Sequence, residues 1–247
     1  MPNTRFRPLF ATLARISIML FPVRDHGTSG ITAWRLALMD VIRIAAALIT
    51  LGLLSTLGCS SAPPHSQENL CSIFDQYPEW YDAAKASEAR WGTPAHILMS
   101  FVRQESAFNE DAKPPRNWFL FVPLPRGSSA EGYAQAQDPA WDEYQDENGG
   151  LFRSRSDMED ALDFIGWYND KSSAALGISK WDPKNLYLAY HEGRGGYSRG
   201  SYASKPEVIR VAENVDRQAR NYGAQLQQCE ERFQCRRWYQ FGPFCSA

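Results

Sequence analysis

Apolar residues recur at helical spacing along most of the chain beyond residue 77. One stripe at three- and four-residue steps consists of Val208, Val211, Val215, Ala219, Tyr222 and Leu226. A second stripe consists of Leu98, Phe101, Val102 and Phe108. Alternation of the kind that marks a half-buried strand is not convincing anywhere. The pattern therefore predicts one mainly α domain.

Prolines and glycines mark where the first helices begin and end. Pro78 suits the first turn of a helix, and Gly92 suits its end, which predicts a helix over 78–91. Thr93 as N-cap, followed by Pro94, predicts a second helix that continues through Phe108.

Later helix starts carry capping signals. Ser156 with Glu159 and Ser204 with Glu207 have capping-box spacing. The helices predicted from these starts, and from Asp182-Pro183, cover 156–176, 182–193 and 204–226, with Gly177 and Gly193 as stops.

A long irregular stretch, 113–155, interrupts the helical pattern. A loop of this length is usually functional or disordered, and its aromatic content argues against disorder. We expect it to line a groove. Its apolar segment 118–125 has two interpretations: it packs as a wall of the groove, or it dips into a membrane.

The segment 1–58 is set apart by an apolar run of fourteen residues, 44–57, which precedes Gly58 and Cys59. A permanent span needs roughly 20 apolar residues, so this run has the length of a signal-peptide core. With the cysteine it resembles a bacterial lipoprotein signal, although Thr56 departs from the usual aliphatic residue. The true start is possibly Met39; the rival interpretation is a cytoplasmic extension with a retained anchor helix. Cys59 would carry the lipid, and 59–75 would be a tether.

Five cysteines leave four once Cys59 is assigned to lipid. These disulfide candidates are Cys71, Cys229, Cys235 and Cys245, and three pairings are open. Two disulfides would suit an oxidising compartment, and 229–247 would form a cysteine-rich aromatic tail. The spacing of His and Cys does not favour zinc, so we expect no metal.

Composition adds little beyond an aromatic content of 13%. Aromatic side chains build ordinary cores and also stack on sugar rings. Without residues 1–58 the chain has 20 basic and 26 acidic residues, a formal charge of −6. No basic stripe is present in the sequence, which argues against a nucleic-acid partner.

Glu105 lies on the apolar stripe of the second helix, four residues after Phe101 and three after Val102. A carboxylate on an apolar face is costly unless it is paired or held neutral. A neutral carboxylic acid near neutral pH can protonate a glycosidic oxygen. The alternative is a glutamate at the edge of the stripe that reaches water or an arginine.

Three sequence blocks carry a family resemblance. They are Arg103-Gln104-Glu105-Ser106-Ala107-Phe108-Asn109, Gly132-Tyr133-Ala134-Gln135-Ala136 and Ala189-Tyr190-His191-Glu192-Gly193-Arg194-Gly195. In this order they resemble the motifs of the lytic transglycosylases related to goose-type lysozyme. The resemblance implies a lysozyme-like single domain over 76–228. Tyr133-Ala134 and His191-Glu192 depart from the family pattern and leave substrate preference open.

The resemblance implies peptidoglycan lytic transglycosylase activity without a cofactor. Glu105 would protonate the oxygen leaving N-acetylmuramic acid and then activate its C6 hydroxyl, which leaves a 1,6-anhydro end. Tyr190 would hold Glu105 or the N-acetyl group, and Gln135 would bind sugar or position the loop. Ser106 would bind substrate or its own helix backbone, and Tyr133 could offer a stacking face.

Two other functions stay open. A lysozyme-like hydrolase would need a second carboxylate, for which Asp111, Glu131 and Asp138 are candidates. An inactive lipoprotein would use the groove only to bind the cell wall. His191 lacks a second ligand at metal spacing, so we expect it to pack or to form a hydrogen bond.

The expected partners are peptidoglycan strands and, through the lipid, a membrane. Ser60 after the cysteine is typical of outer-membrane lipoproteins, which predicts a location on the periplasmic face of that membrane. Protein partners cannot be inferred from the sequence.

Overall fold

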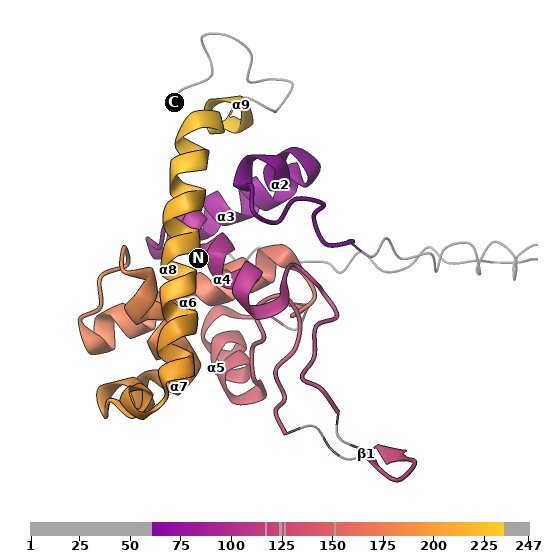
Figure 1. Ribbon diagram of the computed structural model, residues 1–247. Helices are drawn as coiled ribbons and strands as arrows, with labels where there is room; N and C mark the ends of the chain where they lie inside the picture. The colour runs from indigo at the N-terminus through magenta and orange to yellow at the C-terminus, as the bar shows by residue number, and fades with distance from the viewer. Residues whose placement is uncertain (1–60, 117, 124, 126, 151, 235–247) are drawn as a thin grey trace, which may run out of the picture. The chain divides into compact units, whose positions relative to one another are not determined.

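The computed structural model describes residues 61–234 except 117, 124, 126 and 151 (Figure 1). The chain divides into two compact units, Met1–Cys59 and Ser60–Ala247, and the described residues all belong to the second. The predicted signal, Cys59, Cys235 and Cys245 lie outside them. None of the helices in the described ranges is long and apolar enough to cross a membrane.

Helices make up most of the second unit. In chain order the elements are α2 (Leu70–Gln76), α3 (Pro78–Trp91), α4 (Ala95–Ser106), β1 (Trp118–Phe119), β2 (Val122–Pro123), α5 (Asp138–Asn148), α6 (Met158–Leu176), α7 (Pro183–Ser198), the 3-10 turn η1 (Ser201–Ser204), α8 (Pro206–Cys229) and α9 (Glu231–Gln234). This confirms the prediction of a mainly α domain. Helix α3 packs against α6, and α8 packs along α4 and α7, so α8 forms the spine seen in Figure 1.

The predicted stripe of α8 is buried except for Val211, which is half-buried. Val208, Val215, Ala219, Tyr222 and Leu226 are at most 6% exposed. Because this face packs against α4, the longest described helix, α8, supports the helix that carries Glu105.

Several helix starts differ from the prediction. Thr93 does not cap α4: its hydroxyl is buried and without a hydrogen-bond partner, and the helix begins at Ala95. Asp157, rather than Ser156, caps α6 by accepting a hydrogen bond from the Asp160 amide. At α8 no side chain caps the first turn, so the capping box predicted at Ser204 is wrong. Caps depend on the local chain direction, which spacing alone does not determine.

Two predicted irregular segments contain regular structure. Residues 70–75, expected as the end of a tether, lie in α2, whose Leu70, Ile73 and Phe74 are fully buried. Within 113–155 the chain forms α5 and the antiparallel pair β1–β2, which pairs Phe119 with Val122. The pair lies away from the helical body (Figure 1).

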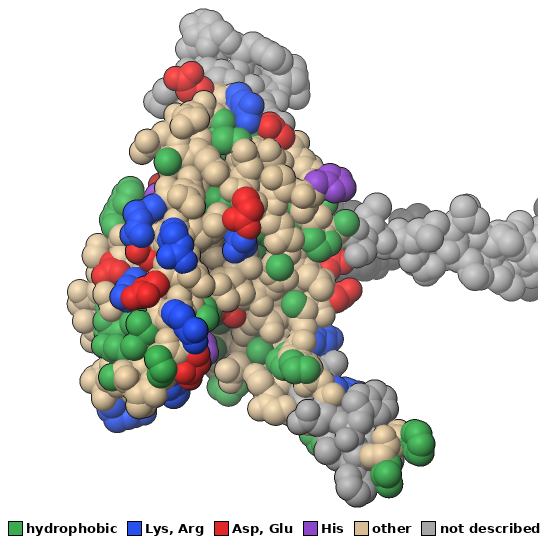
Figure 2. Space-filling model, in the orientation of Figure 1, with side chains coloured by type: hydrophobic (Ala, Val, Ile, Leu, Met, Phe, Trp, Pro, Cys, Tyr) green, Lys and Arg blue, Asp and Glu red, His purple; other side chains and the backbone are tan. Residues whose placement is uncertain are grey.

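The apolar tip of that pair is exposed. Leu120 is 78% and Phe121 94% exposed, and Figure 2 shows hydrophobic side chains at the end of this arm. The expectation that the whole of 118–125 packs as a groove wall is therefore wrong for the tip. The membrane interpretation of this segment stays a prediction.

Two of the four disulfide candidates lie within the described residues, and they pair with each other. Cys71 and Cys229 are bonded, at a sequence separation of 158. The bond joins α2 to the end of α8 and so closes most of the domain into one covalent loop.

Candidate active site

The end of α4 is an abrupt turn that exposes one side of its last residues. Ala107 and Phe108 both have left-handed backbone conformations, with φ of 50° and 61°. Residues other than glycine rarely adopt this conformation, and it costs on the order of 1–3 kcal/mol each. The fully buried Phe108 ring, stacked on Trp80 at 5.8 Å, holds the turn in place. Glu105 lies in the last turn of α4, directly before this bend.

Glu105 is half-buried between the apolar stripe of α4 and the phenol of Tyr187. Leu98, Phe101 and Val102, the preceding residues of its stripe, are fully buried. Desolvation raises the pKa of Glu105 to about 7, and a hydrogen bond from Tyr187 acts in the opposite direction. Near neutral pH the group therefore exists in both protonation states, which an acid/base catalyst requires.

Tyr187 is a site residue that the motif comparison missed. It lies on α7, is 3% exposed, and its hydroxyl is hydrogen-bonded to Glu105. Burial and the nearby carboxylate both raise the pKa of Tyr187, so the phenol stays protonated and acts as a donor. The available signal was its position three residues before Tyr190, which places both side chains on one helix face.

Tyr190 makes a different contact from the one expected. Its hydroxyl donates a hydrogen bond to the Ala134 carbonyl at 2.6 Å. Its ring packs edge-on against Phe101 at 5.5 Å and Tyr168 at 5.0 Å. Tyr190 thus links the third sequence block to the second, while Tyr187 contacts the acid.

A groove of about 730 Å³ opens beside Glu105, a volume typical of ligand sites. We call it the Glu105 groove. Its lining residues are Gln104 to Ala107, Asn109, Asp111 to Pro115, and Gln135. The first sequence block, the bend after α4 and the second block therefore meet here.

Gln135 holds the loop that closes this groove. Its side-chain nitrogen donates to the carbonyls of Ala112 at 2.8 Å and Gly132 at 2.9 Å. Its own backbone is left-handed, with φ of 47°. Of the two expected roles for Gln135, positioning of the loop is the one for which the structure contains contacts.

Two other predicted site residues contact the protein itself. The Ser106 hydroxyl donates to the Val102 carbonyl, one turn back in α4, at 3.1 Å. Tyr133 is 1% exposed and packs edge-on against Trp80. Because the Tyr133 ring is a core side chain, it offers no stacking face; the position instead anchors the second block.

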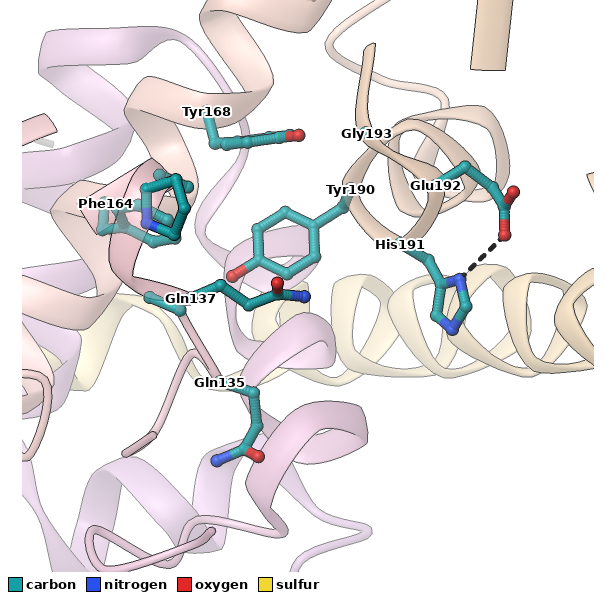
Figure 3. A pocket seen from close by; sticks show the side chains of 11 residues that line it. Gln135, Gln137, Phe164, Tyr168, Tyr190, His191, Glu192 and Gly193 are labelled. Carbon is teal, nitrogen blue, oxygen red and sulfur yellow. Dashed lines mark hydrogen bonds and ion pairs between the residues drawn. The ribbon is translucent and has the colours of Figure 1, made fainter. Parts of the chain in front are cut away.

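A second cavity of about 270 Å³ shares Gln135 with the Glu105 groove. Figure 3 shows the Tyr190 ring in it, with Tyr168 on one side and Gln137 on the other. We call it the Tyr190 pocket. Because both cavities are lined by Gln135, the Tyr190 pocket and the Glu105 groove are neighbours.

His191 and Glu192 line the Tyr190 pocket without forming a metal site. The His191 Nδ1 atom lies 3.1 Å from a Glu192 carboxylate oxygen. Hydrogen bonds from Ser201 and Lys205 lower the pKa of Glu192 to about 2, so its charge is already compensated. Among the described residues no group of three or more potential metal ligands occurs.

Two of the three candidate second carboxylates are engaged in ion pairs. Glu131 contacts Lys113 at 2.7 Å, and Asp138 contacts Arg155 at 2.8 Å. Asp111 is exposed and lines the Glu105 groove, and its backbone amide donates a hydrogen bond to the Asn109 side-chain oxygen at 3.0 Å. Asp111 is therefore the acid that shares a cavity with Glu105.

The comparison with protein families agrees with this geometry. A family model described as a transglycosylase SLT domain matches residues 46–229. The chain belongs to this family. A comparison with curated proteins finds no match, so the assignment rests on the family model.

Membership in the SLT family confirms the resemblance read from the three blocks. It implies peptidoglycan as the substrate and, in general, a cleaving activity of the lytic transglycosylase type. The match begins within the apolar run and ends at Cys229, so it contains every residue of the Glu105 groove.

Proposed function

We propose that this SLT domain cleaves the β-1,4 bond between N-acetylmuramic acid and N-acetylglucosamine and leaves 1,6-anhydro ends. The observation that carries the proposal is the environment of Glu105. It is a desolvated carboxyl group, held by one phenol, at the wall of a groove lined by the family's motif residues.

One carboxyl group can perform both proton transfers. Protonated Glu105 gives its proton to the glycosidic oxygen as the bond to C1 breaks, and the substrate's N-acetyl group stabilises the positive charge. The resulting carboxylate then removes the proton of the C6 hydroxyl, whose oxygen attacks C1. The proton returns to Glu105, so the group ends in the state in which it began.

Tyr187 supports the second of these roles. A hydrogen bond donated to the carboxylate favours the charged form, which is the form that leaves the first step. Desolvation favours the neutral form needed before that step. The two effects oppose each other and keep the pKa of Glu105 at about 7.

Hydrolysis is the alternative that one observation favours. Asp111 lies in the same groove and is exposed, so it could direct a water molecule to C1. In that case the product would carry a reducing end rather than an anhydro ring.

The test is mass spectrometry of purified peptidoglycan digested by the chain from Ser60 onward. The matched variants are Glu105→Gln and Asp111→Asn, each of which keeps the side-chain shape. We expect anhydro-muropeptides from the wild type and from Asp111→Asn, and none from Glu105→Gln. Reducing ends that disappear with Asp111→Asn would establish the hydrolase; an absence of products from all three would favour a wall-binding protein.

We also propose that the chain is anchored by lipid at Cys59 on the periplasmic face of the outer membrane. The support is the sequence of the signal segment and the disulfide, which suits an oxidising compartment. Peptide mapping of the mature protein tests this: a mature chain that begins at a lipid-modified Cys59 is expected, and a peptide from upstream of Met39 would exclude it.

A further inference from the structure

Trp181 carries an exposed indole, in contrast to three buried tryptophans of the described residues. It is 69% exposed, whereas Trp80, Trp141 and Trp167 are at most 5% exposed. An indole left in water forgoes a large burial free energy, so contact with a ligand that covers the ring would be favourable.

The turn that carries Trp181 is fixed on both sides. Before it, Lys180 contacts Asp170 at 2.5 Å, and Ile178 is 6% exposed. After it, the Asp182 side chain caps α7 by accepting a hydrogen bond from the Asn185 amide at 3.0 Å. The indole is therefore presented from a constrained backbone.

Trp181 borders a cavity of about 430 Å³ between α3, the start of α4 and α8. We call it the Trp181 pocket. Its polar lining includes Glu88, His96, Arg220, Gln227 and Glu230. Gly223 forms part of its wall, and a Cβ atom at that position would lie 3.1 Å from the His96 ring.

The charges of this lining are largely compensated within the protein. Lys85 lies between Glu88 at 2.9 Å and Glu230 at 3.2 Å, and Arg220 pairs with Asp216. Burial lowers the pKa of His96, so its ring is neutral at neutral pH. The pocket therefore suits a ligand without strong net charge at the point of contact.

We propose that the Trp181 pocket is a second saccharide-binding site. An exposed indole stacks on the C–H face of a sugar ring, and planar amide, guanidinium and carboxylate groups beside it accept and donate hydrogen bonds to hydroxyl groups. No lining residue is shared with the Glu105 groove or the Tyr190 pocket. That the saccharide is a peptidoglycan strand rests on the proposed function.

The two sites lie at opposite ends of α4. His96 and Glu105 are nine residues apart, which corresponds to a rise of about 14 Å along a helix. The second site would hold the polymer while the groove cuts it, and would matter for insoluble peptidoglycan more than for short fragments.

The test measures binding without cleavage, in the chain from Ser60 onward with Glu105→Gln. Trp181→Ala is compared with Phe152→Ala, which removes another exposed aromatic (98%) that does not line this pocket. We expect Trp181→Ala to weaken sedimentation with purified peptidoglycan and calorimetric binding of N-acetylglucosamine tetramers about tenfold. Phe152→Ala should leave both unchanged, and equal binding by the two variants would overturn the proposal.

A second measurement separates this proposal from the proposed function. With Glu105 intact, Trp181→Ala should release fewer products from insoluble peptidoglycan but cleave short soluble glycans at the wild-type rate. If the wild type cleaves and Trp181→Ala does so equally on both substrates, the second site is excluded. If tetramers bind through Trp181 but the wild type cleaves nothing, the second site stands and the proposed function fails.

Discussion

At the scale of single residues, Tyr187 and Tyr190 have separate tasks although they are one helical turn apart. Tyr187 donates to the Glu105 carboxyl, whereas Tyr190 donates to the Ala134 carbonyl and fills the space between α4 and α6. The pKa of Glu105 therefore depends directly on the hydrogen bond from Tyr187, whereas Tyr190 acts only through packing. This difference can be measured in the pH dependence of the reaction.

We predict that kcat/KM falls as the pH rises through about 7, because the first step needs protonated Glu105. In Tyr187→Phe the hydrogen bond that lowers the pKa of Glu105 is lost, so this decline should move to higher pH. Tyr190→Phe is the control: it should alter KM or stability and leave the pH of the decline unchanged. An unshifted profile in Tyr187→Phe would contradict the role assigned to that phenol.

Glu105 should also destabilise the fold at high pH. A carboxyl group whose pKa rises from 4.5 to about 7 on folding stabilises the protein below pH 4.5, and this contribution is lost as the pH rises to about 7. We predict that Glu105→Gln, which stays neutral, unfolds in urea with a free energy up to about 3 kcal/mol higher than the wild type at pH 8. The two proteins should be equally stable near pH 4, and a constant difference across pH would contradict the raised pKa.

At the scale of elements, the close approach of α3 and α6 determines where the rest of the domain packs. Gly166 of α6 faces α3, and a Cβ atom there would lie 2.4 Å from the Ser87 hydroxyl and 2.7 Å from the Trp91 ring. The Ser87 hydroxyl also donates to the Leu162 carbonyl at 2.8 Å. Nothing larger than glycine fits without separating the two helices.

We predict that Gly166→Ala lowers the free energy of unfolding by about 1–3 kcal/mol through overpacking. The matched control is Gly195→Ala, whose added Cβ would meet only the end of the Arg199 side chain, at 3.2 Å. That variant should be neutral within about 0.5 kcal/mol. Equal urea midpoints for the two variants would show that the α3–α6 contact can relax.

The α5 helix has a polar anchor as well as an aromatic one. Tyr144 of α5 donates to Asp163 of α6 at 2.6 Å, and Trp91 of α3 donates to the same carboxylate, also at 2.6 Å. One half-buried acid, Asp163, therefore joins three helices around the ring cluster of Tyr144, Phe164 and Trp167. Phe164 of this cluster also lines the Tyr190 pocket.

At the scale of the whole molecule, the disulfide and α8 connect the two ends of the domain. Near Cys71–Cys229, the Gln225 side chain accepts from the Leu70 amide at 2.8 Å and donates to the Glu68 carbonyl at 3.0 Å. The first helix is thus bound to the last long one by covalent and polar contacts. Loop closure over 158 residues removes much conformational freedom from the unfolded chain.

We predict that the double variant Cys71→Ser with Cys229→Ser is less stable by on the order of 4 kcal/mol. Thermal unfolding with and without reductant measures the effect. Reductant should lower the Tm of the wild type to that of the variant and leave the variant unchanged. A wild type insensitive to reductant would show that the helical contacts alone hold α2.

Helical periodicity, glycine stops and three short motifs sufficed to predict the helix class, most helix ranges and the acid Glu105. These features are local: they depend on the spacing of apolar side chains and on the backbone preferences of glycine and proline. The helix over 138–148 was missed because its apolar residues are few, Trp141 and Tyr144, and its burial depends on α6.

The partners of the site side chains were decided only by the tertiary structure. Which phenol reaches Glu105, whether Tyr133 faces a ligand or the core, and which cysteine pairs with Cys71 all depend on where helices far apart in sequence come together. Spacing places side chains on a face, but the packing of α4 against α7 and α8 determines what that face meets. The sequence by itself therefore determined which reactive side chains the domain has, and the packing of its helices decided which of them contact one another.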